Sequence, residues 1–205
     1  MLLIERLQIR RAQRTIIDDL ALRVEPGEIV GLVGKNGCGK STLLAAIAGV
    51  LEPHDGRIAL DGASLWGARD ERSRARRNLG YVPEGADPPG FLLADELWAL
   101  CATTRGALPP SQDLRDRLGL DELRAQPIER MSLGQRRRTC LGAAFIGPPK
   151  LLVLDEPDNG LDVLRLDALV RLVTDHAAAG GSCILASHDV VLLEQLGART
   201  FAMKG

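Results

Sequence analysis

The feature that most constrains this fold is an eight-residue, glycine-rich segment, GKNGCGKS, at positions 34–41. It follows a short apolar run at 29–33 and precedes a stretch with helical spacing from Lys40 to about residue 50. The segment matches G-x-x-x-x-G-K-[ST], whose glycines let the backbone curl so that consecutive N–H groups point at phosphate oxygens. A helix that follows such a loop adds its positive N-terminal end. The strand–loop–helix context makes a chance match a weak alternative, so the segment predicts a phosphate-binding loop.

Each position of this loop has an expected role in holding a nucleotide, ATP, with Mg²⁺ as the metal. Lys40 places a positive charge at the β- and γ-phosphates, where it is also a catalytic candidate. The hydroxyl of Ser41 is an oxygen ligand for Mg²⁺. The residues of this segment that we expect to contact the nucleotide are Gly34, Asn36, Gly37, Cys38, Gly39, Lys40, Ser41 and Thr42.

A second motif is an apolar run at 151–154 that ends in two acids, Asp155 and Glu156. In open α/β sheets, ligands bind outside the carboxyl ends of the strands, where these acids would stand. We expect Asp155 to hold Mg²⁺ directly or through water, and Glu156 to act as the catalytic group that polarises the attacking water. A solvated acidic turn is the alternative, and the phosphate-binding loop in the same chain disfavours it.

The order of apolar patterns indicates an α/β fold. Continuous apolar runs at 29–33, 151–154 and 183–186 predict buried strands of a parallel sheet, joined by crossover helices such as one at about 163–178. Alternating patterns elsewhere predict half-buried strands, which we expect to form an antiparallel β edge. The alternating segments are 2–9 and 15–24, and residues 57–60 indicate another short strand before a turn.

Between about residues 87 and 146 the strand signals vanish, and pairs of prolines punctuate segments with helical spacing. This stretch predicts an inserted helical subdomain. We expect a single domain over 1–205, with a nucleotide-binding core and β subdomain in 1–86 and 147–205 and the helical subdomain in 87–146.

Three further motifs narrow the class of protein. The sequence MSLGQ at 131–135 lies at the start of a helical stretch, PDNGLD at 157–162 follows the two acids, and SHD at 187–189 follows an apolar strand. In this order they resemble the LSGGQ signature, the D-loop and the switch histidine of ABC ATPases. The signature departs from that pattern at Met131 and Leu133. The resemblance covers the whole chain and implies a P-loop NTPase core.

The resemblance implies an ATPase that works as a head-to-tail homodimer or heterodimer with two MgATP at its interface. In this family, Ser132, Gly134 and Gln135 at a helix N-terminus reach the γ-phosphate bound by the other protomer. Asp162 of the D-loop is a further nucleotide-site candidate. His188 is the expected γ-phosphate sensor. ATP binding closes the dimer, hydrolysis opens it, and a separate integral-membrane permease subunit converts this into transport.

Three positions depart from the family pattern. Arg11 stands where many ABC ATPases have an aromatic residue against adenine, and its guanidinium plane could stack there instead. Glu84 stands where the Q-loop usually has Gln, and we expect it to be a Mg²⁺ ligand with a part in catalysis. The alternative is that Glu84 only begins the segment that contacts the membrane chain in this family. Asp158 replaces the usual Thr of the D-loop.

Some of these departures resemble particular exporters. Pro83 and Glu84, with the acid- and proline-rich segment that follows them, resemble the ATPases of type-2 ABC exporters. The compact length and Arg11 resemble the haem exporter ATPase of cytochrome c maturation. Both alternatives stay open, and both predict an exporter.

Composition excludes several other classes. The net charge of −1 and pI of about 6.3 give no global basic field for nucleic acid or anionic lipid. The four cysteines lack metal-ligand or redox spacing, and no apolar run approaches a membrane span or signal peptide. We therefore expect a cytoplasmic protein that reaches the inner face of the cell membrane through its permease. The run at 136–138, three arginines, is interpreted as a solvated helix face.

The sequence disfavours two alternative functions. A soluble ABC ATPase of DNA repair or translation would resemble two fused cassettes or carry a long coiled coil, whereas this chain shows one cassette and no heptad arm. An inactive, ATP-binding regulatory module is disfavoured by the intact Lys40, Asp155, Glu156 and His188.

Overall fold

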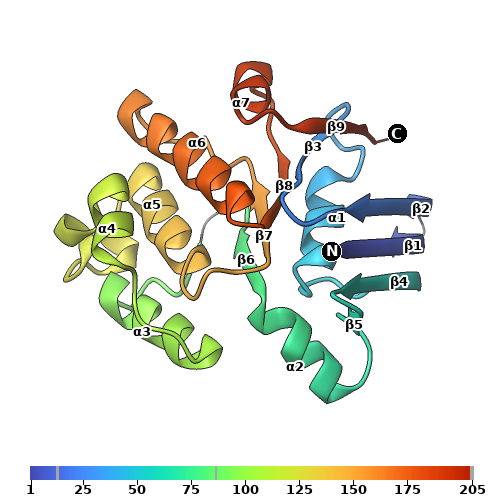
Figure 1. Ribbon diagram of the computed structural model, residues 1–205, viewed down its shortest axis with the longest axis horizontal. Coiled ribbons are helices and arrows are strands. Elements are labelled where there is room, and N and C mark those ends of the chain that lie inside the picture. The colour runs from blue at the N-terminus through green and yellow to red at the C-terminus, as the bar shows by residue number, and fades with distance from the viewer. Residues whose placement is uncertain (13, 86, 204–205) are drawn as a thin grey trace.

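The computed structural model describes residues 1–12, 14–85 and 87–203, which form two sheets and a surrounding set of helices (Figure 1). The larger sheet is parallel, with the strand order β6-β7-β8-β3-β9. Its strands are β3 (Ile29–Val33), β6 (Leu79–Val82), β7 (Leu151–Asp155), β8 (Ser182–Ala186) and β9 (Arg199–Ala202).

Strand β7 shows why the central strands have continuous apolar sequences. All of its residues are buried. Leu152 and Leu154 belong to the core beneath the helical region, whereas Leu151 and Val153 belong to the core beneath the antiparallel sheet. Because successive side chains of a strand point to opposite faces, a strand covered on both faces needs apolar residues throughout.

The smaller sheet is antiparallel, with the order β2-β1-β4-β5. Its three longer strands match the strands predicted at 2–9, 15–24 and 57–60, and the fourth is a short addition after a turn. These strands are β1 (Leu2–Arg11), β2 (Arg14–Val24), β4 (Asp55–Leu60) and β5 (Ala63–Ser64). Helix α1 (Lys40–Ile47) contributes Leu43, Leu44 and Ile47 to the apolar core that this sheet covers.

The helical region follows β6 in the chain and packs against the other side of the parallel sheet. It contains α3 (Ala94–Arg105), α4 (Gln112–Leu118) and α5 (Leu133–Ala144), with 3₁₀ turns at Asp121–Leu123 and Ile128–Arg130. Trp98 of α3 is buried, and its indole Nε1 donates to the carbonyl of Thr139 in α5 at 2.9 Å. The predicted α/β fold class, with its parallel sheet, antiparallel edge and helical insertion, is confirmed.

Three more helices complete the described structure: α2 (Arg69–Arg77), α6 (Val163–Ala178) and α7 (Val190–Gln195). Helix α6 lies alongside the helical region, and α2 lies at the bottom of the view, where it borders α3 (Figure 1). Across the described residues, no helix combines the length and apolar character needed to cross a membrane. The division into 1–86, 87–146 and 147–205 stays a prediction, and its positions 86 and 205 lie outside the described residues.

The interpretation of the arginines at 136–138 as a solvated helix face is wrong. Arg137 is fully buried at 0% exposure, and its two neighbours are half-buried. Arg138 donates to the carbonyls of Leu118 and Gly119 and pairs with Glu122. The guanidinium groups serve as partners for main-chain carbonyls at the ends of neighbouring elements, which a residue-by-residue charge count does not reveal.

Candidate functional site

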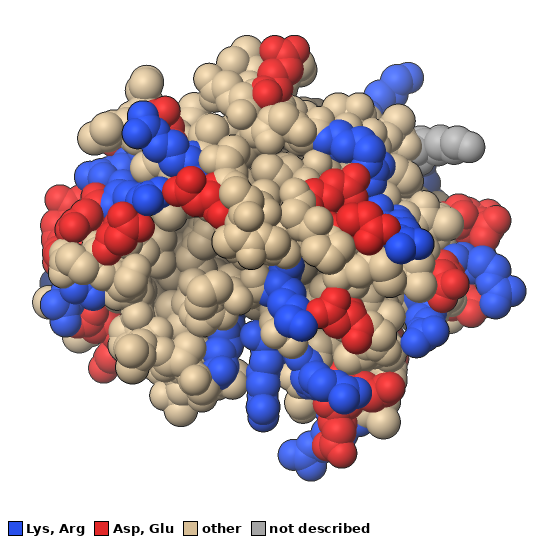
Figure 2. All heavy atoms as spheres, viewed as in Figure 1, with Lys and Arg blue, Asp and Glu red and all other residues tan. Residues whose placement is uncertain are grey.

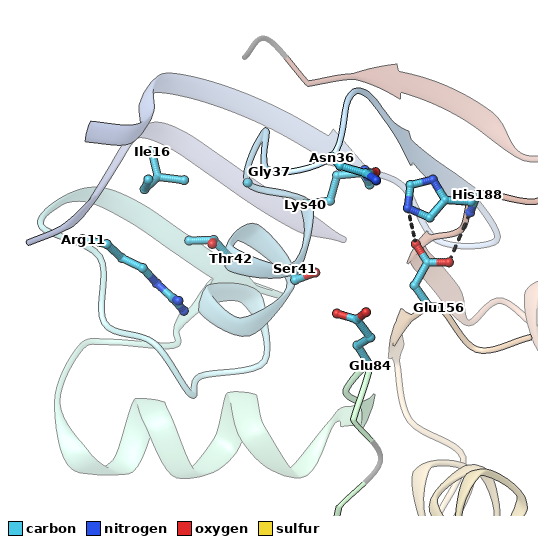
Figure 3. A pocket seen from close by; sticks show the side chains of 11 residues that line it. Arg11, Ile16, Asn36, Gly37, Lys40, Ser41, Thr42, Glu84, Glu156 and His188 are labelled. Atoms are coloured by element: carbon cyan, nitrogen blue, oxygen red, sulfur yellow. Dashed lines mark hydrogen bonds and ion pairs between the residues drawn. The ribbon is translucent and has the colours of Figure 1, made fainter. Parts of the chain in front are cut away.

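A pocket of about 400 Å³ lies at the carboxyl ends of β3, β7 and β8, beside the β1–β2 hairpin (Figure 3). The elements that meet there come from distant parts of the chain, because parallel strands bring their carboxyl ends to one edge. Every lining residue except Ile16 is a predicted site residue. The lining residues are Arg11, Ile16, Asn36, Gly37, Gly39, Lys40, Ser41, Thr42, Glu84, Glu156 and His188.

The glycine-rich loop has a shape that only small residues permit. Gly39 has a φ of 101° directly before α1, and a Cβ there would lie 3.0 Å from Cγ2 of Ile16. Gly34 lies against Cys38, so that an added Cβ would approach its Sγ to 2.8 Å. Gly34 and Cys38 therefore shape the loop rather than line the pocket. Helix α1 has no acid in its first turn, which leaves its positive end available to an anion.

Lys40 and Ser41 begin α1 and point in different directions. Lys40 is only 8% exposed, and its ammonium group donates to the carbonyls of Gly34 at 3.0 Å and Lys35 at 3.5 Å, so it lies across the loop. The Ser41 hydroxyl donates to Oδ1 of Asp155 at 3.2 Å. This bond joins the loop after β3 to the end of β7, although the residues are distant in sequence. Lys40 thus offers a positive charge to a phosphate, and Ser41 and Asp155 offer a pair of oxygens to a cation.

Glu156 occupies an unusual backbone position at the end of β7. Its φ of 46° is in the left-handed region, and its N–H donates to the carbonyl of Ala186 at 2.9 Å. The carboxylate accepts the N–H of His188 at 3.2 Å, and its other oxygen lies 3.3 Å from the ring Nε2 (Figure 3). The imidazole itself is 60% exposed and faces the pocket. A carboxylate and an exposed imidazole are thus held together at the pocket wall.

Burial sets the protonation behaviour of the two acids. It raises the pKa of Glu156 above its usual value, an effect that the N–H of His188 partly offsets. Burial also raises the pKa of Asp155, and the hydrogen bond from Ser41 opposes this. A carboxylate with a raised pKa is a stronger base than an ordinary one. Glu156 therefore has the location and the basicity to accept a proton from water.

Glu84 lies at the opposite wall of the pocket, directly after β6 and Pro83. Its side chain is exposed and points toward the side of the pocket that holds Ser41 (Figure 3). The sheet places β6 next to β7, so Glu84 and Asp155 follow adjacent strands. The structure thus brings together the three residues proposed from the sequence as metal ligands.

The donors at this edge fit Mg²⁺ better than a metal that needs a full protein cage. In the described part of the chain, no group of at least three His, Cys, Asp or Glu side chains forms a metal cluster. Mg²⁺ prefers oxygen ligands and usually keeps waters, binding through one or two carboxylates plus substrate phosphates. The Ser41 hydroxyl and the Asp155 carboxylate, 3.2 Å apart, are oxygen donors of this kind. Glu84 adds a carboxylate to the same pocket.

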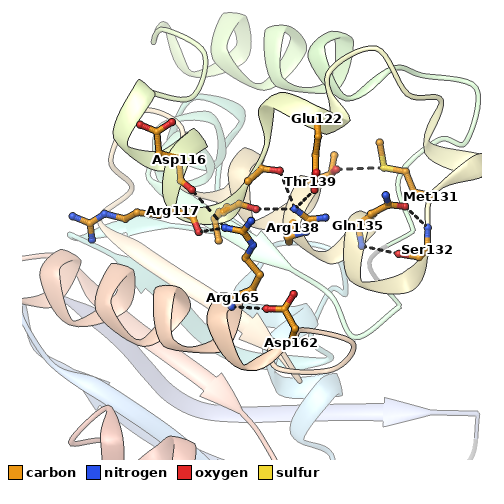
Figure 4. Close-up of polar contacts among 12 residues, drawn as sticks. Asp116, Arg117, Glu122, Met131, Ser132, Gln135, Arg138, Thr139, Asp162 and Arg165 are labelled. Atoms are coloured by element: carbon orange, nitrogen blue, oxygen red, sulfur yellow. Dashed lines mark hydrogen bonds and ion pairs between the residues drawn. The ribbon is translucent and has the colours of Figure 1, made fainter.

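The signature residues lie outside this pocket. Ser132 caps α5: its Oγ accepts the N–H of Gln135 at 3.2 Å, and its own N–H donates to Oε1 of Gln135 at 2.8 Å (Figure 4). Ser132 is exposed, so the N-terminal end of α5 is open to solvent. Gly134 passes so close to the D-loop that an added Cβ would lie 2.2 Å from the carbonyl of Gly160. The structure therefore places the signature beside the D-loop, away from this chain's own phosphate loop.

The D-loop residues have local partners. Asp162 caps α6 by accepting the N–H of Arg165 at 2.8 Å (Figure 4). Asp158 accepts the hydroxyl of Ser187 at 2.9 Å, which ties the D-loop to the segment that carries His188. Asp162 does not line the pocket, so its assignment as a nucleotide contact has no support within one chain.

Sequence reasoning missed two residues of this region. Ile16 lines the pocket next to Arg11, but in the sequence it is an ordinary apolar position of an alternating strand. Arg137 donates hydrogen bonds to the main-chain carbonyls of Pro83 and Glu84, next to the pocket. No local pattern marks either residue, because each acts through a partner that the fold supplies.

The fold and the pocket define a nucleotide-hydrolysing protein with a phosphate-binding loop. The family model described as ABC transporter matches residues 17–159. The chain therefore belongs to the ABC transporter family, in which it is an ATP-binding domain and an ATPase. The resemblance inferred from the motifs is confirmed.

Two curated relatives illustrate the range of this family. The cobalt import ATP-binding protein CbiO of Rhodobacter capsulatus is 34% identical over 196 residues, covering 89% of this chain and 68% of that protein. The cytochrome c biogenesis ATP-binding export protein CcmA of Nitrosococcus oceani is 34% identical over 189 residues, covering 92% of this chain and 86% of that protein.

Solved structures have the same fold. One described as the ATP binding subunit of an ABC transporter matches with a TM-score of 0.90 and 27% identity, covering 98% of this chain and 85% of its own. A dimeric ATP-binding cassette in a post-hydrolysis state with ADP and Pi matches with a TM-score of 0.80 and 22% identity, covering 100% of this chain and 94% of its own.

Proposed function

We propose that this chain is the ATP-hydrolysing subunit of an ABC transporter and that it drives a separate membrane-spanning subunit. The observation that carries the proposal is the pocket itself. It combines a phosphate-binding loop, a buried acid pair and an exposed histidine at one edge of a parallel sheet. The names of CbiO and CcmA, which belong to transport systems, support this role.

In this proposal ATP lies along the loop with its phosphates at the N-terminal end of α1. Lys40 turns from the loop carbonyls toward the β- and γ-phosphates, whose charge it neutralises. Glu156 accepts a proton from the attacking water, and His188 donates a hydrogen bond toward the γ-phosphate. Arg11 and Ile16 would flank the adenine, with the guanidinium plane stacked on the base.

Ser41, Asp155 and Glu84 are the residues that would hold Mg²⁺. When bound, this ion supplies charge that offsets the phosphate oxygens during transfer. The protein's own part is to fix the oxygen donors, which the bond between Ser41 and Asp155 does before any ligand arrives.

The working unit that we propose is a head-to-tail dimer. The exposed N-terminal end of α5, with Ser132, Gly134 and Gln135, lies outside its own pocket and would complete the pocket of the partner. A cassette with the same fold was solved as a dimer with ADP and Pi, which supports a dimer as the working unit. The dimer can be formed by two copies of this chain or by this chain and a related one. Its place would be the cytoplasmic face of the membrane, bound to the permease.

We propose export as the direction of transport. Two observations favour export: the segment at Glu84 resembles the Q-loop of type-2 exporter ATPases, and the chain is similar to CcmA, an export protein. The similarity to CbiO, an import protein, is of the same size and favours the opposite direction. Inverted membrane vesicles from cells that contain both subunits test the direction. ATP should load such vesicles with cargo, as measured by mass spectrometry against Lys40→Ala vesicles, whereas an importer would empty them.

The ATPase role is tested by Lys40→Ala. Loss of the ammonium group should lower phosphate release by at least about 100-fold, the scale of one lost transition-state contact. A matched control is Lys150→Ala, because Lys150 is an exposed lysine that pairs with Asp61 away from the pocket. Equal phosphate release by wild type and Lys40→Ala would show that the loop does not hold the nucleotide.

A further inference from the structure

Arg137 of α5 is a charged side chain that the fold removes entirely from water. Its exposure is 0%, whereas arginine is almost never fully buried unless it is paired. Removing a charged group from water costs free energy unless it is paired and hydrogen-bonded, so the partners of Arg137 indicate its role.

The contacts of Arg137 reach two segments that carry candidate metal ligands. One guanidinium nitrogen, Nη1, donates to the carbonyl of Pro83 at 2.8 Å and more weakly to that of Asp155 at 3.3 Å. The other, Nη2, donates to the carbonyl of Glu84 at 2.6 Å. The planar group thus spans the loop after β6 and the end of β7 at once, which a single ammonium group cannot do.

Arg137 also connects these segments to the signature. It is on the first turns of α5, the helix that Ser132 caps and whose Gly134 packs against Gly160. Helices move as rigid bodies, so a shift of α5 moves the guanidinium group and, through its hydrogen bonds, the carbonyls of Pro83 and Glu84. The geometry couples the position of the signature to that of the Glu84 loop.

We propose that Arg137 is a positioning residue, which fixes the main chain of Glu84 and Asp155 so that their side chains meet at one Mg²⁺ and which links this spacing to α5. The inference rests on the proposed function, since it needs a nucleotide with Mg²⁺ in the pocket. Arg137 itself is neither in the phosphate loop nor in the pocket lining.

A second arginine provides a matched control. Arg105 of α3 is half-buried and donates only to main-chain carbonyls, those of Leu79, Ala143, Ala144 and Ile146. Leu79 begins β6, whereas Pro83 and Glu84, two of the three Arg137 partners, follow the other end of the same strand. The two arginines therefore perform the same structural task at opposite ends of β6, and only one is near the candidate metal ligands.

The experiment compares Arg137→Gln and Arg137→Lys with Arg105→Gln and Arg105→Lys. Binding of a fluorescent ATP analogue is measured in EDTA and then across a Mg²⁺ titration, and thermal unfolding shows whether each variant folds. We expect both Arg137 variants to bind the analogue normally in EDTA. In the titration they should need about 10-fold more Mg²⁺ to reach half of the Mg²⁺-dependent change in analogue binding, because mutating the groups that support metal ligands weakens metal affinity on this scale. The Arg105 variants should follow wild type in both conditions.

Three results would overturn the inference. Folded Arg137 variants with the Mg²⁺ dependence of wild type would show that the spacing does not depend on the guanidinium group. Equal losses of affinity with and without Mg²⁺ would indicate general damage to the pocket. Failure of both Arg137 variants to fold, when the Arg105 variants fold, would make Arg137 a residue of the core alone. Wild type that binds no analogue at any Mg²⁺ concentration would instead refute the proposed function.

Discussion

At the scale of single residues, the site contains a carboxylate whose ionised form the fold disfavours. Asp155 is 3% exposed, and burial raises its pKa above the ordinary 3.8. Between that value and the raised one, the folded state binds more protons than the unfolded state. The free energy of unfolding therefore falls as the pH rises through this window. At neutral pH the ionised Asp155 lowers stability, as residues with a catalytic or binding role often do.

This sign leads to a prediction for the ligand-free protein. Asp155→Asn keeps the shape and an acceptor for Ser41 but removes the charge, so its melting temperature at pH 7 should exceed that of wild type. The difference should narrow as the pH falls toward 3.8, where wild-type Asp155 becomes protonated as well. Scanning calorimetry at several pH values provides the measurement, with the exposed Asp167→Asn as control. A difference that stays constant with pH would contradict this account.

Glu84 gives a second prediction at this scale. A carboxylate is a stronger Mg²⁺ ligand than a neutral amide, so Glu84→Gln should raise the Mg²⁺ concentration for half-maximal ATPase activity several-fold. The titration is performed on the isolated protein, without a membrane partner. The exposed Glu52→Gln serves as control. Superimposable curves for wild type and Glu84→Gln would mean that Glu84 begins a contact segment and does not touch the metal.

The sequence predicted the residues of this site that carry local motifs. The loop at 34–41 and the acids at 155–156 stand beside apolar strands, and the structure brings both to the same sheet edge. Ile16 and Arg137 could not be found in that way, because their importance depends on which distant segment lies next to them. A run of arginines predicts a solvated face from charge alone, whereas the fold gave Arg137 three carbonyl partners.

At the scale of elements, helix caps test the role of α5. Ser132 caps α5, and Ser111 caps α4 by accepting the N–H of Leu114 at 3.3 Å. Ser132→Arg and Ser111→Arg should each cost about 1 kcal/mol of stability, because each removes one cap. Only Ser132→Arg should reduce ATP hydrolysis, by at least about 100-fold, since in the proposed dimer it removes a group that would contact the partner's phosphate.

Nucleotide binding to the isolated protein separates this role from a structural one. Ser132→Arg should still bind a fluorescent ATP analogue with the affinity of wild type, as measured at protein concentrations too low for dimers. A collapse of that affinity would show that Ser132 supports its own chain's pocket. Normal hydrolysis by Ser132→Arg would remove the signature from the mechanism.

The elements that the sequence predicted have clear apolar periods. Helix α2 was not predicted, because its sequence, RDERSRARR, has only Ala75 buried and therefore lacks an apolar stripe. Its arginines have other partners: Arg76 lies 5.2 Å from the ring of Trp66, and the helix stacks on β5. A polar helix of this kind is stabilised by contacts that its side chains make outside the helix, and the apolar periodicity of a single sequence does not report them.

At the scale of the whole molecule, the central prediction concerns assembly. Glu156→Gln should keep ATP binding while phosphate release falls by at least about 100-fold, the contribution of a general base. ATP that is not consumed would hold two protomers together, so sizing chromatography with MgATP should show a dimer. The double variant Lys40→Ala, Glu156→Gln is the control and should stay monomeric. A single variant that elutes as a monomer at high concentration would argue against the head-to-tail dimer.

The strand order of the larger sheet has a consequence for how this protein comes into being. Strand β3, which leads into the phosphate loop, lies between β8 and β9, so that Leu32 pairs with Ala186 on one side and Phe201 on the other. A ribosome releases β3 well before either of these two neighbours. The phosphate-binding loop is therefore synthesised long before the sheet that supports it is complete. We expect a growing chain to bind no nucleotide until β8 and β9 have docked beside β3, and these long-range pairings predict slow folding.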